Sequence, residues 1–155
     1  MLLIHGGLWD GLDAARFWHA PGVVAGLRRR GIEVDAPDRL ARPADWTADA
    51  LRLTPTRPVA VVGASNGCSV AVRLALTMPA SVTRLVLAWP ATAVDDPPTR
   101  ALFAELGAGP AVVDALLAGE TLRGTTDTEL ATLGMPVRVL PARYTSGRRS
   151  TRCWS

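Results

Sequence analysis

The stretch that decides the fold is Val61-Val62-Gly63-Ala64-Ser65-Asn66-Gly67, which contains the pattern G-x-S-x-G. It joins a purely apolar run, Val59–Val62, to a segment, Asn66–Met78, whose apolar residues lie nearly all round a helix. A purely apolar strand is typical of one buried on both faces of a sheet, and a helix with apolar residues nearly all round it is largely buried. The sequence therefore predicts a tight turn from a buried strand into a buried helix, with Ser65 at its centre.

The predicted turn would bring groups suited to nucleophilic chemistry to the edge of the sheet. The flanking glycines leave room for neighbouring backbone, while Ser65 is strained and presents its Oγ at the carboxyl end of the strand. The Asn66 N–H, in the first turn of the helix, would face an oxyanion formed there. A second signal is His5-Gly6-Gly7, where the Gly7 N–H is expected to complete an oxyanion hole. The alternative is a glycine-rich turn in some other α/β fold.

Apolar runs alternate with longer helical stretches, which is typical of a parallel sheet covered on both faces. With 155 residues, the chain fits one domain. We expect an α/β fold, a doubly wound and mostly parallel sheet of about five strands: Met1–His5, Ile32–Ala36, Val59–Val62, Val82–Trp89 and Pro136–Leu140. The expected helical segments are Ala14–Arg30 with an interruption near Pro21, Asp45–Leu53, Asn66–Met78 and the less regular Asp96–Leu133, in which Thr126 and Glu129 have capping-box spacing.

Composition and charge exclude several classes of function. All 17 basic residues are arginine, and four of them lie in the last 13 residues, so the high isoelectric point belongs to an irregular tail, residues 143–155. The sequence has no nucleic-acid-binding motif and no apolar run of the roughly 18–20 residues that span a membrane, and we expect no secretory signal. The cysteines, Cys68 and Cys153, lack zinc-ligand spacing. We expect a cytoplasmic protein without metal or cofactor.

Taken together, these features resemble the α/β-hydrolase superfamily, in particular its serine esterases and lipases, from Met1 to about Pro141. The resemblance rests on the HGG loop, the Ala36-Pro37-Asp38-Arg39 turn, the GASNG turn and the strand Arg84–Ala88. It implies that Ser65 is the nucleophile, that Gly7 and Asn66 supply oxyanion N–H groups, and that a small ester or related acyl compound is hydrolysed through an acyl-enzyme. It also implies one domain, residues 1–142, with a small helical cap at about residues 93–134.

The catalytic acid and base that the resemblance implies are not found where they are expected. A serine needs a histidine to take its proton and an acid to orient that histidine. Here no carboxylate follows Glu129 and no histidine follows His19. Asp95 and Asp96 stand at an alternative acid position, although they also fit a helix N-cap before two prolines.

Other residues that bear chemistry have simpler interpretations. His5 is expected to hold the oxyanion loop by a hydrogen bond, and His19 lies in the first helix, away from the position of a base. Cys68 is expected in the core. Four tryptophans would line an apolar acyl pocket or simply pack: Trp9, Trp18, Trp46 and Trp89.

Three interpretations remain open from the sequence. The chain is an active serine hydrolase, a catalytically inactive hydrolase-like binding protein, or an incomplete version of a longer hydrolase. We favour the third as the reason for the missing base, because residues 143–155 resemble out-of-frame translation. The substrate and the oligomeric state are not indicated.

Overall fold

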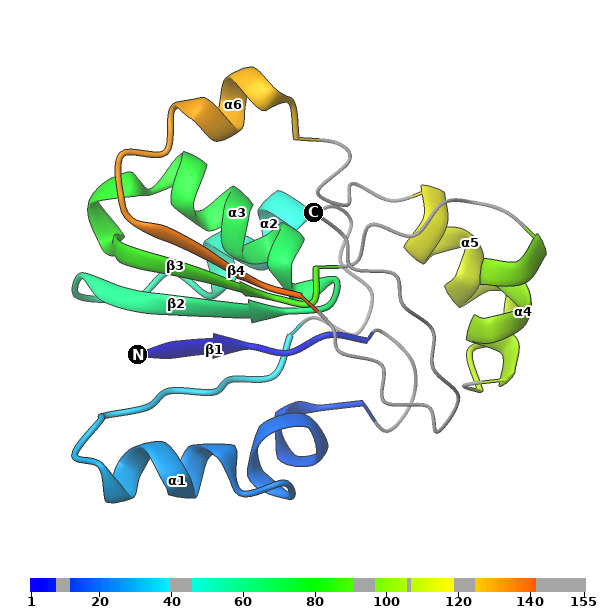
Figure 1. Cartoon of the computed structure of the whole chain (residues 1–155), viewed down its shortest axis with the longest axis horizontal. Coiled ribbons are helices and arrows are strands. Elements are labelled where there is room, and N and C mark those ends of the chain that lie inside the picture. Colours follow the sequence, from blue (N-terminus) through cyan, green and yellow to red (C-terminus); the bar gives the residue numbers. More distant parts are fainter. Residues whose placement is uncertain (8–11, 40–45, 91–96, 106, 119–124, 142–155) are drawn as a thin grey trace.

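A four-stranded parallel sheet forms the centre of the computed structural model (Figure 1). The structure describes residues 1–7, 12–39, 46–90, 97–105, 107–118 and 125–141. The strands lie in chain order, each paired in parallel with the next: β1 (Leu2–Ile4), β2 (Val59–Ala64), β3 (Val82–Ala88) and β4 (Val137–Leu140). The predicted α/β class and parallel sheet are therefore confirmed.

The segment expected to form a fifth strand, residues 32–36, makes only a short contact with the sheet. Leu2 and Asp35 form an isolated parallel bridge. Leu3 N–H donates to the Asp35 carbonyl at 2.9 Å, and Asp35 N–H donates to the Met1 carbonyl at 2.9 Å. The pairing ends there because β1 is three residues long and because Pro37 has no N–H to donate. Within the described residues the sheet thus has four strands rather than about five.

Helices cover both faces of the sheet, as predicted (Figure 1). The short π-helical turn η1 (Ala15–His19) and α1 (Val23–Arg29) lie on one face. They are separated at Gly22, whose φ of +78° follows the predicted interruption at Pro21. On the other face lie α2 (Trp46–Arg52), α3 (Gly67–Thr77) and α6 (Asp127–Ala131).

The core is divided by the sheet into two clusters. One joins β1, β2 and β3 to α2 and α3, with Leu74 and Leu85 among its fully buried side chains. The other joins the opposite face of the sheet to η1 and α1 through residues such as Trp18 and Val24. Eight of the eleven residues of α3 are buried, which confirms the expectation from its apolar composition.

Two helices lie beyond the carboxyl ends of the strands (Figure 1). The helices α4 (Pro97–Glu105) and α5 (Pro110–Ala118) pack on each other around Phe103, Val113 and Leu117.

At α6, Thr126 Oγ1 accepts from Glu129 N–H at 3.1 Å and Thr126 N–H donates to Glu129 Oε2 at 2.8 Å, so the predicted capping box is confirmed.

Two further features concern the surface. All four residues of β4, at the edge of the sheet, are exposed. No helix within the described ranges combines the length and the apolar character needed to cross a bilayer.

Candidate active site

The turn between β2 and α3 places Ser65 in a strained backbone conformation. Its φ is +53°, in the left-handed region that non-glycine residues rarely adopt. Ser65 N–H donates to the Ala88 carbonyl of β3 at 3.0 Å, and Cys68 N–H donates to the Ser65 carbonyl at 3.1 Å. Ser65 is partly exposed, whereas Ala64 and Asn66 are buried. The predicted strand-to-helix turn is therefore present, with Ser65 at its tip.

The glycines around Ser65 are needed because backbone approaches backbone there. A Cβ on Gly67 would lie 2.5 Å from the His5 carbonyl oxygen and 2.6 Å from that of Ile4. A Cβ on Gly63 would lie 2.6 Å from the Gly67 carbonyl oxygen, and one on Gly6 would lie 2.6 Å from Ser65 Cβ. The start of α3 thus rests directly on the end of β1. This contact places the HGG loop against the Ser65 turn.

The two expected oxyanion donors, Gly7 and Asn66, are brought together, with a contact that the sequence did not reveal. Gly7 has a φ of +77°, and its N–H donates to Asn66 Oδ1 at 2.9 Å. Asn66 is buried and immediately precedes α3, so its own N–H lies outside the ladder of helical hydrogen bonds. The side chain of Asn66 therefore accepts a hydrogen bond from the N–H of Gly7, the other expected donor.

A buried ion pair lies behind this contact. Arg39 is 6% exposed and Asp49, on α2, is 0% exposed. Arg39 Nε donates to Asp49 Oδ2 at 2.6 Å, while Arg39 Nη1 donates to the His5 carbonyl at 3.1 Å and to Asn66 Oδ1 at 3.0 Å. Burial lowers the pKa of the Arg39 guanidinium, and the Asp49 carboxylate opposes that shift. The sequence predicts a turn at Arg39 but does not indicate a role for Asp49, because nothing in the spacing of the two residues points to a pair.

His5 is held at both ring nitrogens. Its Nε2 lies 3.1 Å from Arg39 N, so Nε2 accepts from that N–H. The ring proton is therefore assigned to Nδ1, which donates to the Gly6 carbonyl at 2.9 Å. Burial lowers the pKa of His5, the hydrogen bond to Gly6 opposes the shift, and the Arg39 charge adds to it. His5 thus fixes the loop, as the sequence analysis expected, and has no nitrogen directed to Ser65.

The lowered pKa of His5 makes the stability of the fold depend on pH. In the unfolded chain the imidazole binds a proton near its ordinary pKa of about 6.5, whereas the folded protein binds it only at lower pH. The unfolded state therefore binds more protons in this interval, and the free energy of unfolding is expected to fall as the pH decreases below about 6.5. Urea unfolding in steps from about pH 7.5 to pH 5.5 measures this slope.

A His5→Gln variant locates the source of that slope. It should show a flatter dependence on pH, although it is less stable throughout. A wild-type curve that stays flat down to about pH 5.5 would show that His5 is not held as the neutral imidazole.

Comparison with known proteins identifies the fold. No protein-family model and no curated protein matches the sequence. Among solved structures, an α/β-hydrolase enzyme from the sediment metagenome of the Mar Chica lagoon, Morocco, superposes with a TM-score of 0.62 at 16% identity over 89% of this chain and 65% of that one. The 2-hydroxy-6-oxo-6-phenylhexa-2,4-dienoate hydrolase of Rhodococcus sp. gives a TM-score of 0.61 at 17% identity, over 89% and 70%. The N-formylmaleamic acid deformylase of Pseudomonas putida gives 0.60 at 20% identity, over 91% and 73%.

The chain has the α/β-hydrolase fold. It spans 65% of the length of the first of these structures and 70% and 73% of the other two. The second and third are named for different activities, a dienoate hydrolase and a deformylase. The likeness therefore establishes the fold. It does not indicate which substrate this chain would take.

The other residues that the sequence singled out are a cysteine, two possible acids and the arginine-rich tail. Cys68 is buried in α3 with Sγ 3.2 Å from the Gly63 carbonyl oxygen, and burial raises the pKa of its thiol to about 12. This agrees with the expected core role. The possible acids, Asp95 and Asp96, lie outside the described residues, as does the arginine-rich tail, residues 143–155. No group of three or more metal-ligating side chains is found among the described residues.

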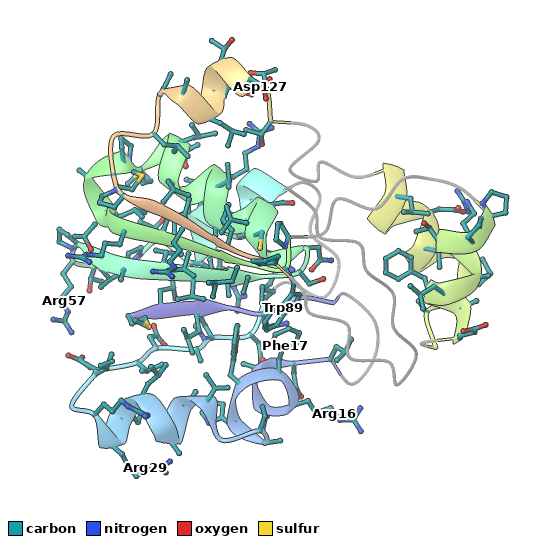
Figure 2. All side chains as sticks on the ribbon, in the orientation of Figure 1. Arg16, Phe17, Arg29, Arg57, Trp89 and Asp127 are labelled. Carbon is teal, nitrogen blue, oxygen red and sulfur yellow. The ribbon has the colours of Figure 1, made fainter. Side chains whose placement is uncertain are left out.

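The tryptophans differ in their surroundings. Trp18 is buried and packs edge-on against Phe17, with ring centroids 4.8 Å apart. Trp89 is 44% exposed, has a φ of +38°, and follows β3 at the carboxyl end of the sheet (Figure 2). Trp9 lies outside the described residues, and the side chain of Trp46 is not among those described. Of the four, Trp89 is the one shown exposed beside the Ser65 turn.

Proposed function

We propose that this chain forms the nucleophile site of a serine hydrolase that acts on a small ester or a related acyl compound through an acyl-enzyme. The observation that carries the proposal is the left-handed φ of Ser65 between a buried strand and a buried helix. Such strain persists only where the surrounding structure enforces it, and it is concentrated at functional sites. Here the enforcing contacts are those of Gly6, Gly63 and Gly67.

In the proposed reaction, Ser65 Oγ attacks the acyl carbon and negative charge develops on the acyl oxygen. The backbone N–H groups of Asn66 and Gly7 are the proposed donors to that oxygen. The Gly7 N–H already donates to Asn66 Oδ1. In the proposed reaction this N–H donates to the oxyanion as well as to Asn66 Oδ1, or to the oxyanion in place of it. A charged oxygen is the stronger acceptor, which favours the exchange at the moment when charge develops. Collapse of the intermediate breaks the bond from the acyl carbon to the leaving group, which departs with the proton that Ser65 gives up, carried by solvent water, and leaves the acyl group on Ser65 for water to hydrolyse.

The proton of Ser65 has no histidine acceptor at this site. The sequence contains two histidines; both nitrogens of His5 are engaged, and His19 lies exposed at the end of η1. This observation favours a second candidate function, in which the chain binds acyl compounds without turning them over.

We assign α4 and α5 to the cap of the proposed site. They form their own small apolar cluster and lie beyond the carboxyl ends of the strands (Figure 1). Ligands of open α/β sheets bind at that end. In this proposal the cap and the exposed Trp89 form the apolar wall against which the acyl group rests.

The chain is expected to label slowly at Ser65 with a fluorophosphonate and to show little or no turnover of p-nitrophenyl acetate. Loss of the base from a triad leaves about 10³–10⁴-fold rate enhancement over water. Mass spectrometry of the labelled chain identifies the modified residue, and Ser65→Ala should remove the label. Ser69→Ala, which removes a buried serine hydroxyl of α3, is the matched control and should keep it.

The outcomes separate the two candidate functions. Turnover that disappears in Ser65→Ala would establish an active hydrolase, and repeating the assay with His5→Ala and His19→Ala would identify the base. Labelling without turnover would support the binding protein with a competent nucleophile. A wild-type chain that carries no label at Ser65 would overturn the proposed nucleophile.

A further inference from the structure

We infer that Arg39 is the positioning residue of the oxyanion hole, an inference that rests on the proposed function. A single nitrogen, Arg39 Nη1, donates both to the His5 carbonyl at 3.1 Å and to Asn66 Oδ1 at 3.0 Å. These two acceptors belong to the two segments that supply the proposed oxyanion donors. Arg39 therefore ties the HGG loop to the Ser65 turn from behind.

The tie continues to the donor itself. Asn66 Oδ1 accepts from Arg39 Nη1 and, at 2.9 Å, from the Gly7 N–H. One carboxamide oxygen thus sets the place of Gly7 relative to Asn66. The Arg39 backbone adds a further hydrogen bond, from its N–H to His5 Nε2 at 3.1 Å. Both the main chain and the side chain of Arg39 consequently hold the strand end from which the loop begins.

Asp49 orients the guanidinium that makes these contacts. The Asp49 carboxylate on α2 accepts from Arg39 Nε at 2.6 Å, at 0% exposure. A guanidinium is planar and rigid, so a hydrogen bond at Nε fixes the direction of Nη1. Lysine carries the same charge on a flexible stem with one nitrogen. It is able to pair with Asp49, but it cannot bond to Asp49, His5 and Asn66 in the arrangement that arginine provides.

Positioning of this kind acts on the rate of attack more than on binding. A displacement of about 1 Å at a reacting group costs up to about 100-fold in rate, and loss of one oxyanion donor costs about 100- to 1,000-fold. Arg39 is buried, and its side chain bonds to Asp49, His5 and Asn66, so it acts through the loop and the turn. Its replacement is therefore expected to slow the chemical step of Ser65 while leaving the affinity of the first encounter unchanged.

The test uses the full chain and a fluorophosphonate, with the maximal labelling rate and the half-saturating concentration measured separately. Arg39→Lys is expected to lower the maximal rate about 10- to 100-fold and to leave the half-saturating concentration within about twofold. The matched control is Arg52→Lys. Arg52 is an exposed arginine that donates to the neighbouring Asp38 carbonyl at 2.8 Å, and its replacement should change neither quantity.

A double variant addresses the case in which Arg39→Lys fails to fold. Arg39→Met with Asp49→Leu replaces the buried pair by apolar side chains of similar size, a change that buried ion pairs often tolerate. It removes every side-chain hydrogen bond from Arg39 to the loop and the turn. The same loss of maximal rate is expected. A double variant that folds and labels at the wild-type rate would overturn the inference.

Amide exchange of Gly7 provides a readout that does not depend on Ser65. In Arg39→Lys or the double variant, the Gly7 N–H should exchange about tenfold faster by NMR than in the wild type, while amides of β2 stay protected. Unchanged Gly7 exchange would overturn the role of Arg39. If the wild-type chain does not label at all, the proposed function is overturned, whereas the Gly7 exchange still decides whether Arg39 holds the loop.

Discussion

The Gly67→Ala variant is expected to lose about 3 kcal/mol or more of its free energy of unfolding, and to stop labelling at Ser65. The added Cβ would lie 2.5 Å from the His5 carbonyl oxygen and 2.6 Å from that of Ile4. Both obstacles are backbone atoms of the segment that ends β1, so no side-chain rotation relieves the overlap. Insertion of atoms into a packed core costs about 1–3 kcal/mol, and more where nothing yields. Urea unfolding measures the loss.

Gly26→Ala is the matched control for that substitution. Gly26 lies within α1, and the nearest atoms to its added Cβ are the ends of the flexible Arg29 and Arg30 side chains, both 3.8 Å away. Removing a glycine from a helix interior is expected to stabilise the fold by about 0.5–1 kcal/mol. The same chemical change should thus have opposite signs at the two sites. Equal stabilities of Gly67→Ala and the wild type would show that α3 does not rest on β1 as described.

The features that the sequence predicted well are those encoded by local pattern. The buried strand and helix around Ser65 follow from apolar residues with strand and helix periodicity. The break near Pro21 and the capping box at Thr126 follow from the chemistry of single residues. Each of these is determined within a few positions of the chain, and the structure confirms them.

The features that the sequence did not predict depend on contacts between distant segments. Residues 32–36 have strand character, yet their pairing is limited by the three-residue partner β1 and by Pro37. The Arg39–Asp49 pair joins α2 to a segment that lies ten positions earlier in the chain. The bond from Gly7 to Asn66 spans 59 positions. Periodicity carries no information about such partners, so the donors were foreseen and the network behind them was not.

The Asp49→Ala variant is expected to lose about 3–5 kcal/mol of its free energy of unfolding. Asp49 is fully buried, and its carboxylate accepts from Arg39 Nε at 2.6 Å. Removing one member of a buried pair leaves the other charge in a poorly solvated place, which costs about 3–5 kcal/mol. The hydrogen bonds of Arg39 to His5 and Asn66 go to neutral oxygens and do not replace the lost countercharge. Denaturant unfolding at neutral pH gives the value.

Replacing Arg39 and Asp49 together by apolar residues separates the cost of burying an unpaired charge from the cost of lost packing. The double variant Arg39→Met with Asp49→Leu is expected to lie within about 1–2 kcal/mol of the wild type, because no charge is left buried without its partner. The Glu33–Arg57 ion pair on the surface is the matched control, and Glu33→Ala should change stability far less than Asp49→Ala, because solvent screens an exposed pair. If Asp49→Ala destabilised no more than Glu33→Ala, the guanidinium would have to reach solvent in the variant. The Arg39 side chain would then be too mobile to hold Asn66 and the HGG loop in one place.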